Sequence, residues 1–303
     1  MGSSCGSIHS PTCRKEAAGT MSDIYSERLN PVPQGFSIHK AHRTSPFNMP
    51  LNHYHDAYEI YYMCSGERYY FIKDRTYRVQ PGDLVLIDKH VLHKTQNITN
   101  GHERILLHYR DGFLDSLFGG SAWDPRSVFG QPVIRLNIKQ QAVVESLLDR
   151  LLEESKAQTP ESPIYVKITL MELLLFAGRC MRELASVPER TEPDNPMFER
   201  VASVAAYING HYAEDLSLTL LSTLFHINPH YLSRIFNKVT GFSFVEYVNL
   251  VRLKEAQKLL SAGELNVTEV AESVGFESLT HFGRVFKAST GMSPKQYRQR
   301  FGN

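Results

Sequence analysis

Hydrophobic positions near the C-terminus recur at helical spacing and are interrupted by glycine and capping residues. Phe282 and Phe286 lie on one apolar stripe, which marks the buried side of a helix. Gly275 is suited to end the preceding helix, because a positive φ is cheap for glycine, and Ser278 is suited to cap the next one. The pattern predicts a short helix capped by Thr268, a tight turn, and a second helix with a polar, basic outer face. This is the arrangement of a helix-turn-helix unit.

The same pattern occurs a second time upstream. Asn228 is suited to cap the second helix of this copy, and Pro229 stands at its first position, where proline is favoured. The aligned pairs, each 50 residues apart, are Leu232 with Phe282, Arg234 with Arg284, Phe236 with Phe286, and Gly241 with Gly291. Between the copies, residues 244–260 keep helical periodicity up to Gly263 and span about 25 Å at 1.5 Å per residue. A rigid helix of this length could present two reading helices to adjacent major-groove segments, about 34 Å apart.

The string from residue 271 to residue 298 is more specific than a generic helical hairpin. It reads Ala-x3-Gly-Phe-x-Ser-x3-Phe-x3-Phe-Lys-x3-Gly-x-Ser-Pro-x2-Tyr-Arg. This closely resembles the signature of the AraC/XylS family of bacterial transcription regulators. The resemblance implies two helix-turn-helix units that bind duplex promoter DNA. It also implies an alanine at the position of the first copy to which we align Thr223.

The outer faces of the two second helices carry the residues that we expect to contact DNA. Arginine bound to guanine through two hydrogen bonds is the commonest specific contact in the major groove. The candidate base contacts are His230, Ser233 and Arg234 in the first unit, and Leu279, Thr280, Gly283 and Arg284 in the second. The candidate phosphate contacts, which position the protein without reading sequence, are Asn237, Lys238, Lys287, Ser293 and Lys295. The alternative for each arginine is a surface salt bridge, and Leu279 could instead cover the hairpin.

The N-terminal half has a different pattern, with short runs of aromatic and β-branched residues between turn residues. Strands are predicted at 59–64, 68–72 and 83–87. Short strands at this spacing favour a small antiparallel barrel or jelly roll. Residues 22–46 would form an arm able to fold over the mouth of this barrel.

Histidine and glutamate residues in this half follow the spacing His-x-His-x3-Glu-x6-Gly and then Gly-x10-His-x3-Asn. The spacing resembles the two motifs of the cupin fold, although Phe47, Asp88 and His90 replace glycine, proline and glycine of those motifs. Strand alternation places positions 53, 55, 59 and 61 on one face. The candidate pocket residues are His53, His55, Glu59, Tyr61 and His93.

Three interpretations of these side chains stay open. Three imidazoles and a carboxylate suit a divalent transition metal, whose ligands would be His53, His55, Glu59 and His93. The same groups could instead hydrogen-bond within the barrel, or line a pocket for a small effector. We favour the effector pocket and no resident metal or cofactor, because the resemblance implies regulators that keep fragments of the motif without the metal. The many tyrosines of the strands favour a carbohydrate effector that stacks on a ring.

Two amphipathic helices are predicted after the barrel, over residues 136–156 and 164–184. The second is apolar on more than one face, so it should be buried on several sides. Together the helices offer a dimer seam. Packing on their own barrel is the alternative for the first helix. Residues 186–196 are proline-rich and charged, which is typical of a linker.

Composition adds bounds on the class of protein. A chain of 303 residues has room for two domains, and 42% hydrophobic content with a net charge of +1 is typical of an ordinary soluble protein. Basicity is local, since residues 284–300 contain five Lys and Arg and no acidic residue. Two of the four cysteines lie in residues 1–20, which resemble a vector-derived leader, and Cys64 and Cys180 are predicted to be buried thiols. No run resembles a signal peptide or a membrane span, so we expect a cytoplasmic location.

The sequence therefore predicts an α+β multidomain chain with a cupin-like antiparallel β-barrel (jelly roll), two following helices, and an all-α domain. The predicted division is a leader at 1–20, an effector-sensing domain with its arm at 21–135, a helical dimerisation region at 136–185, a linker at 186–196, and a double helix-turn-helix domain at 197–303. We expect no enzymatic activity but an effector-responsive regulator that binds duplex promoter DNA as a homodimer. As an activator it would also contact RNA polymerase. Two alternatives stay open: a metal-dependent cupin enzyme fused to a DNA-binding module, and an effector-free dimeric regulator.

Overall fold

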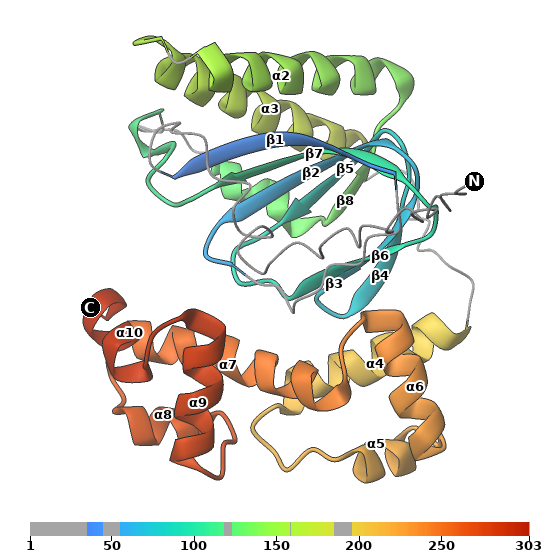
Figure 1. Cartoon of the computed structure of the whole chain (residues 1–303), viewed down its shortest axis with the longest axis vertical. Helices are drawn as coiled ribbons and strands as arrows, with labels where there is room; N and C mark the ends of the chain where they lie inside the picture. Colours follow the sequence, from blue (N-terminus) through green and yellow to red (C-terminus); the bar gives the residue numbers. More distant parts are fainter. Residues whose placement is uncertain (1–34, 45–54, 118–122, 158, 185–195, 303) are drawn as a thin grey trace, which may run out of the picture.

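A computed structural model describes residues 35–44, 55–117, 123–157, 159–184 and 196–302. The N-terminal part is a two-sheet β structure covered by helices on one side, and the C-terminal part is entirely helical (Figure 1). The predicted α+β architecture is therefore confirmed. The predicted leader, His53, and the linker apart from Pro196 lie outside the described residues.

The strands of the N-terminal part form two antiparallel sheets. The larger sheet has the strand order β1-β7-β2-β5-β8, with β1 at Phe36–Arg43, β7 at His102–Tyr109, β2 at Tyr58–Ser65, β5 at Asp83–Ile87 and β8 at Val133–Arg135. The smaller sheet has the order β4-β3-β6, with β4 at Arg75–Val79, β3 at Arg68–Ile72 and β6 at His93–Asn97. The three strands predicted from the sequence are present in these sheets.

The predicted arm is wrong for residues 36–43. These residues form β1, which pairs along its whole length with β7, from Phe36 opposite Tyr109 to Arg43 opposite His102. An edge strand forms because alternate residues such as Phe36 and Ile38 are buried in the same core as the following helices.

Strand alternation on β2 divides its side chains between two cores. Tyr58, Ile60 and Tyr62 pack toward helices α2 (Ile138–Ala157) and α3 (Ser162–Leu184), which cover the outer face of the larger sheet (Figure 1). Tyr61 and Met63 point the other way, into the layer between the two sheets. The predicted common face of positions 55, 59 and 61 is therefore this inner layer. Two short 3₁₀ helices, Asp115–Leu117 and Pro125–Gly130, connect β7 to β8.

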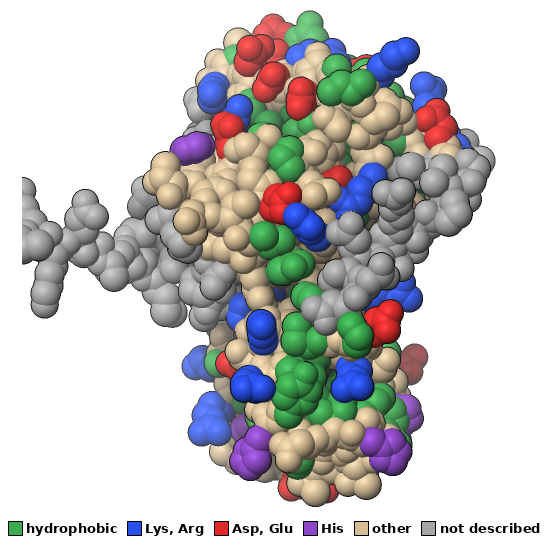
Figure 2. Space-filling model, turned by 90° about the vertical axis from the view of Figure 1, so that its right-hand side faces the viewer, with side chains coloured by type: hydrophobic (Ala, Val, Ile, Leu, Met, Phe, Trp, Pro, Cys, Tyr) green, Lys and Arg blue, Asp and Glu red, His purple; other side chains and the backbone are tan. Residues whose placement is uncertain are grey.

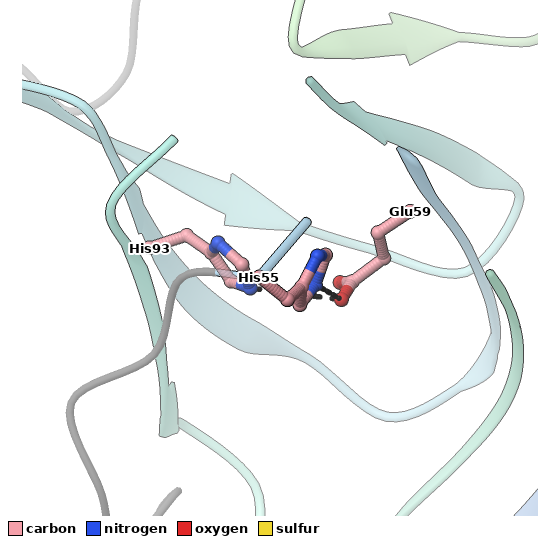
Figure 3. Close-up of side chains that lie close together, drawn as sticks. All are labelled: His55, Glu59 and His93. Carbon is pink, nitrogen blue, oxygen red and sulfur yellow. Dashed lines mark hydrogen bonds and ion pairs between the residues drawn. The ribbon is translucent and has the colours of Figure 1, made fainter. Parts of the chain in front are cut away.

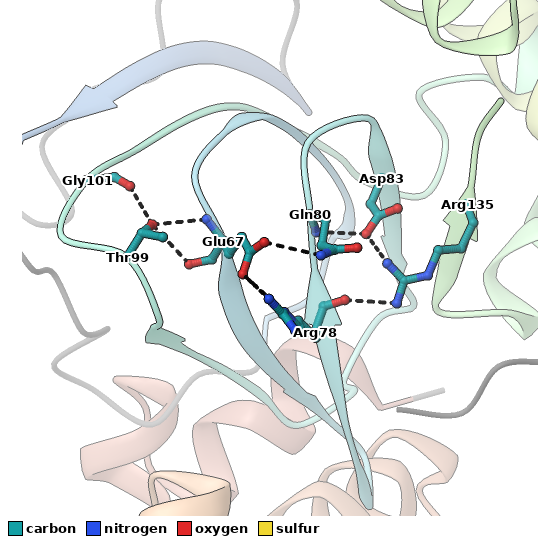
Figure 4. Close-up of polar contacts among 7 residues, drawn as sticks. All are labelled: Glu67, Arg78, Gln80, Asp83, Thr99, Gly101 and Arg135. Atoms are coloured by element: carbon teal, nitrogen blue, oxygen red, sulfur yellow. Dashed lines mark hydrogen bonds and ion pairs between the residues drawn. The ribbon is translucent and has the colours of Figure 1, made fainter. Parts of the chain in front are cut away.

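One end of the smaller sheet is fixed to the larger sheet by a polar network (Figure 4). The Glu67 carboxylate accepts hydrogen bonds from Arg78 at 2.6 Å and from the Gln80 amide at 3.2 Å. Asp83 of β5 accepts from the Gln80 backbone N–H at 2.8 Å and from Arg135 of β8. Glu67 precedes β3 and Gln80 follows β4, so the network anchors the ends of these strands and leaves the opposite end of the sheet unconstrained by it.

The C-terminal part consists of helices around two cores that share the long helix α7. The helices are α4 at Pro196–His211, α5 at Leu218–Leu224, α6 at Pro229–Thr240, α7 at Phe244–Ala262, α8 at Val267–Ser273, α9 at Leu279–Thr290 and α10 at Pro294–Phe301. The predicted long helix and both predicted hairpins are confirmed. The cap of α8 differs from the prediction, since Asn266 and not Thr268 caps it, in a capping box with Glu269.

The helix-crossing residue of the first hairpin is Ser222 and not Thr223. The Ile227 amide donates to the Ser222 carbonyl at 2.9 Å, as the Phe276 amide donates to the Ala271 carbonyl at 2.9 Å in the second hairpin. Ser222 is buried and Thr223 is exposed. The alignment at Thr223 was therefore wrong by one residue.

Candidate nucleic-acid interface and effector site

The first reading helix, α6, is set by strong signals at both ends. The Asn228 side chain accepts from the backbone N–H groups of His230 at 3.0 Å and Tyr231 at 3.2 Å, and Pro229 occupies the first turn. Gly241 ends the helix in the left-handed region with φ of 77°. Both ends of α6 are thus fixed by local sequence.

The outward face of α6 carries most of the predicted DNA contacts. His230, Arg234, Asn237 and Lys238 are exposed, and Ser233 is half-buried. The Arg234 guanidinium lies 5.5 Å from the centre of the exposed Tyr231 ring. Tyr231 was not among the predicted contacts, although an exposed aromatic beside the cap of a reading helix was a usable signal.

The second reading helix, α9, presents a matching face. Leu279, Thr280, Arg284 and Lys287 are exposed, as is Lys295 on α10. Gly283 is half-buried, and a Cβ built there would meet nothing within 4 Å, so this part of the surface is open. In the described part of the chain neither Arg234 nor Arg284 forms an ion pair, which speaks against the salt-bridge alternative. The Ser293 hydroxyl already serves the capping box of α10.

Helix α7 holds the two hairpins in one rigid frame. It contains 19 residues, opens with a capping box at Ser243, and ends at Gly263. At 1.5 Å per residue it spans about 28 Å. Arg252 on α7 donates to the carbonyl oxygens of Tyr212 at 2.7 Å and Glu214 at 2.8 Å, and it lies over the Phe276 ring. On the face seen in Figure 2, Lys, Arg and His side chains lie over the helical domain in the lower part of the molecule.

In the N-terminal domain, three histidines lie around a buried carboxylate. One precedes β2, one is on β6 and one is on β7. The Glu59 carboxylate on β2 is 2% exposed and lies 3.0 Å from His55 Nε2, 2.9 Å from His108 Nε2 and 3.6 Å from His93 Nε2. The hydroxyl of Tyr70 on β3 donates to the same carboxylate at 2.5 Å. We call His55, Glu59, His93, His108 and Tyr70 the Glu59 cluster. Figure 3 shows His55 and His93 turned toward Glu59.

The structure adds two members to the predicted site. The predicted Tyr61 lies in the same inner layer, and its ring centre is 5.4 Å from that of Tyr70. His108 on β7 and Tyr70 were missed by the sequence reasoning, because only strand pairing and the packing of the two sheets bring them to Glu59. The register of β2 with β7 was the missing information, since it places Glu59 opposite His108.

The charges of the cluster stabilise one another. Burial alone would raise the pKa of Glu59, but the positive charge of His93 and the hydrogen bonds from His108 and His55 hold that pKa well below its usual range. Burial alone would lower the pKa of His55, but its hydrogen bond to Glu59 raises it. The cluster therefore favours an anionic carboxylate beside positive charge.

The orientation of two imidazoles fits a bound cation. His55 Nδ1 lies 2.8 Å from the Ala57 carbonyl oxygen, and His93 Nδ1 lies 2.8 Å from that of Val91. Because a carbonyl only accepts, each Nδ1 carries a proton, and Nε2 is the nitrogen that each ring turns toward Glu59. When the ring is charged, Nε2 donates to the carboxylate, and when the ring is neutral, the Nε2 lone pair can bind a metal. The ligand atoms of His55, Glu59 and His93 all lie within 4.8 Å of one another. These residues fit a divalent transition metal, which would supply a positive centre for an oxygen atom of a ligand.

A separate cavity of about 440 Å³ lies on the other face of β2. Its lining includes Tyr58, Tyr109, Asp111, Trp123 and Arg126. None of the predicted pocket residues that the structure describes lines it. The Glu59 cluster is instead reached through side chains that are themselves partly exposed, His55 at 19% and His108 at 25%.

Comparison with known proteins identifies two kinds of domain in the chain. Residues 221–300 match the helix-turn-helix domain model, and residues 42–174 match the model of the AraC-like ligand-binding domain. The combination defines a ligand-responsive transcription regulator, and the chain belongs to the AraC family. The predicted recognition is confirmed.

Individual relatives cover most of the chain. It is 28% identical to the HTH-type transcriptional regulator YfiF of Bacillus subtilis over 90% of this chain and 87% of that protein. It is 27% identical to the HTH-type transcriptional activator RhaR of Escherichia coli over 84% of this chain and 88% of that protein. Among solved structures, ToxT of Vibrio cholerae is 16% identical, with a TM-score of 0.38 over 90% of this chain and all of that chain.

Two smaller expectations also have outcomes. Within the described residues Cys180 is a buried free thiol, as predicted, whereas Cys64 is only half-buried. No helix in the described part is long and apolar enough to span a bilayer.

Proposed function

We propose that this protein activates transcription by binding promoter DNA through α6 and α9 in response to a small molecule held at the Glu59 cluster. The observation that carries the DNA half is the pair of exposed arginines, Arg234 and Arg284, at equivalent positions of two helices fixed to α7. The relative RhaR is named a transcriptional activator, which supports activation and, with it, contact with RNA polymerase. No catalytic role is proposed.

Selection from random duplex DNA tests the DNA half. The full chain should enrich a site with two sequence blocks separated by about one helical turn, ~34 Å, because α7 fixes the two reading helices at that order of spacing. Recovery of a single block, or of no sequence preference, would contradict the use of both units.

We propose that the Glu59 cluster is the effector site. The chemical class of its ligand is a polyhydroxylated compound, such as a carbohydrate. A buried carboxylate, imidazoles and the Tyr70 hydroxyl are the groups that bind several hydroxyls at once, and partial exposure of His55 and His108 gives access. Thermal-shift screening against sugars and sugar acids tests this, since a ligand at 100 times its Kd stabilises by about 2.7 kcal/mol.

A matched pair of variants distinguishes this site from the separate cavity. Glu59→Gln should abolish the thermal shift, and Tyr109→Phe, which changes a hydroxyl in the lining of the cavity, should leave it intact. The reverse result would move the effector to the cavity. No stabilising compound in a broad panel would favour the effector-free regulator.

The orientation of the imidazole Nε2 atoms favours a metal ion as a second candidate ligand. Elemental analysis of the purified protein tests it. Stoichiometric zinc, nickel, iron or manganese that is lost in His55→Ala and retained in His39→Ala would establish the metal. A metal content that is the same in both variants would exclude the cluster as its site.

We propose that α2 and α3 form the homodimer seam. They carry apolar side chains that stay exposed within the described part of the chain: Ile138, Val143, Ile164, Tyr165, Ile168 and Leu175. Ile164 and Ile168 lie one helical turn apart on α3, with 60% and 51% exposure. This also explains why the sequence of α3 is apolar on more than one face. One face packs on the larger sheet, and the other would pack on the second subunit of the dimer.

A further inference from the structure

The smaller sheet has different neighbours on its two faces. Its inner face meets the Glu59 cluster, and its outer face lies against the first helix-turn-helix unit (Figure 1). Phe71 of β3 and Leu92, just before β6, belong to the same hydrophobic core as α4, α6 and α7. The sensor and the first DNA-binding unit therefore share one core.

Strand β3 connects the two faces through neighbouring residues. Tyr70 points inward and donates to Glu59 at 2.5 Å. Phe71, the next residue, points outward, with its ring centre 6.2 Å from that of Phe242 and 5.9 Å from that of Tyr247. A shift of the Tyr70 backbone therefore moves Phe71 against the corner between α6 and α7.

Strand β6 repeats the arrangement. His93 is fully buried and faces Glu59 at 3.6 Å. Lys94, the next residue, points outward, where its ammonium donates to the carbonyl oxygen of Gly241 and lies 4.9 Å from the centre of the Phe242 ring.

Two further polar contacts complete this surface. The amide of Gln96 donates to the carbonyl oxygen of Lys238 at 2.9 Å in the orientation that satisfies both of its polar atoms. The Tyr247 hydroxyl donates to the carbonyl oxygen of Lys73, in the turn after β3, at 2.6 Å. We call Phe71, Lys94, Gln96 and the Lys73 carbonyl the dock.

Parts of the dock and of the Glu59 cluster lie at the same end of the smaller sheet, although Gln96 lies toward the other end of β6. Lys73 follows β3 and His93 begins β6, whereas the network of Glu67, Gln80 and Asp83 fixes the opposite end of the sheet. A change at the cluster therefore acts on strand ends that contact the dock and lie away from this polar network.

We propose that the dock is the surface through which the Glu59 cluster controls the first helix-turn-helix unit. A ligand that takes the Glu59 carboxylate competes with the Tyr70 hydroxyl and with His93, and the resulting movement of β3 and β6 loosens their hold on the corner between α6 and α7. The inference rests on the proposed function, and it names how the effector site regulates. Control acts on one unit, because a Cβ at Gly291, the equivalent of Gly241, would meet nothing within 4 Å in the described structure.

Hydrogen–deuterium exchange of the full chain tests this without knowledge of the ligand or operator. Tyr70→Phe removes only the hydroxyl that donates to Glu59. We expect backbone amides of residues 238–247 to exchange at least about threefold faster in this variant, because local opening sets exchange rates. The equivalent residues 288–297 of the second unit should not change. Unchanged exchange at 238–247, or equal change in both units, would overturn the proposal.

Two glycines provide a matched control. Gly241 and Gly291 end their helices with φ of 77° and 75°, so alanine strains both caps alike, but only at Gly241 would the new Cβ meet Lys94, at 2.7 Å from Cδ. Gly241→Ala should therefore speed exchange at β6, and Gly291→Ala should not. Equal behaviour of the two variants would contradict a specific dock. If Gly241→Ala does not fold, Lys94→Ala takes its place in the comparison with Gly291→Ala.

A double-variant cycle on DNA affinity separates this proposal from the proposed function. Tyr70→Phe should change the Kd for the selected duplex in the wild-type background and change it less in a background that carries Phe71→Ala, because Phe71 is the residue through which β3 contacts the corner between α6 and α7. An equal effect in both backgrounds would exclude the dock as the route of control. Absence of any duplex binding by the wild-type chain would instead overturn the proposed function, while the exchange result would still decide the dock.

Discussion

Arg284 was predicted as a DNA contact from the sequence, and its side chain is exposed in the structure. Its position on α9 followed from the repeat with Arg234, and the structure leaves both side chains at the surface without an ion pair in the described residues. What the sequence could not supply was the direction of each side chain relative to the buried stripe of Phe282 and Phe286, which packing into the second core determines.

Arg284→Ala should weaken binding to the selected site by about 1–3 kcal/mol and relax base preference at one position, since a paired arginine–guanine contact is lost. Fluorescence anisotropy on the selected duplex and on its single-base variants measures this. Arg284→Lys is the matched control, because it keeps the charge without the planar fork. A loss of equal size on random DNA would show that Arg284 contacts only phosphate.

The Glu59 cluster gives a pH dependence with a definite sign. The pKa of His55 is raised in the folded protein, so its charged form adds stability below the unfolded value of about 6.5, and this contribution is lost as pH rises through the folded pKa. The difference in free energy of unfolding between wild type and His55→Gln should therefore be larger at pH 6 than at pH 8.5. Urea unfolding in the presence of a chelator measures it. A difference that does not vary with pH would contradict the charged pair.

At the scale of elements, local signals determined boundaries and long-range contacts determined partners. Asn228, Pro229 and Gly241 delimited α6 because each acts through its own backbone. The edge strand β1 was interpreted as an arm because its pairing partner, β7, lies far away in the sequence. The Thr223 alignment was wrong by one residue because the helix crossing is identified by backbone hydrogen bonds, which place Ser222 there.

Helix α7 should behave as a rigid strut with a fixed phase. Two alanines inserted after Arg252, where the two hairpin cores divide, rotate the second unit by about 200°, since each residue turns a helix by about 100°. The footprint should shrink to one half. Four inserted alanines rotate it by about 400°, close to a full turn, and should partly restore the second half. DNase footprints of equal length in all three proteins would contradict the strut.

At the scale of the whole molecule, the exposed apolar face of α3 predicts the oligomeric state. Ile168→Glu should shift sedimentation from dimer to monomer, because a buried charge without a partner is costly at an interface. Lys167→Glu, on the neighbouring position of the same helix, is the control for charge alone. A dimer that persists in Ile168→Glu would place the seam elsewhere.

The sequence by itself determined most helices of the DNA-binding half of this protein, although it did not predict α4. Its caps, stops and apolar stripes act over three or four residues, and the repeat supplied the second unit and the strut. The sequence also placed His55 and Glu59 on one face, because strand alternation acts over the same short range, whereas His93 was added through the resemblance to the cupin motifs. These features are local, so they can be predicted without coordinates.

Only the tertiary structure decided how the halves meet. His108 joins Glu59 through the register of β7 on β2, and Tyr70 joins it through the packing of one sheet on another. The contact of Lys94 with Gly241 links residues far apart in the chain, and sequence periodicity cannot predict such a contact. Such contacts depend on how whole faces fit together, and for this reason the candidate route from effector to DNA became visible only in three dimensions.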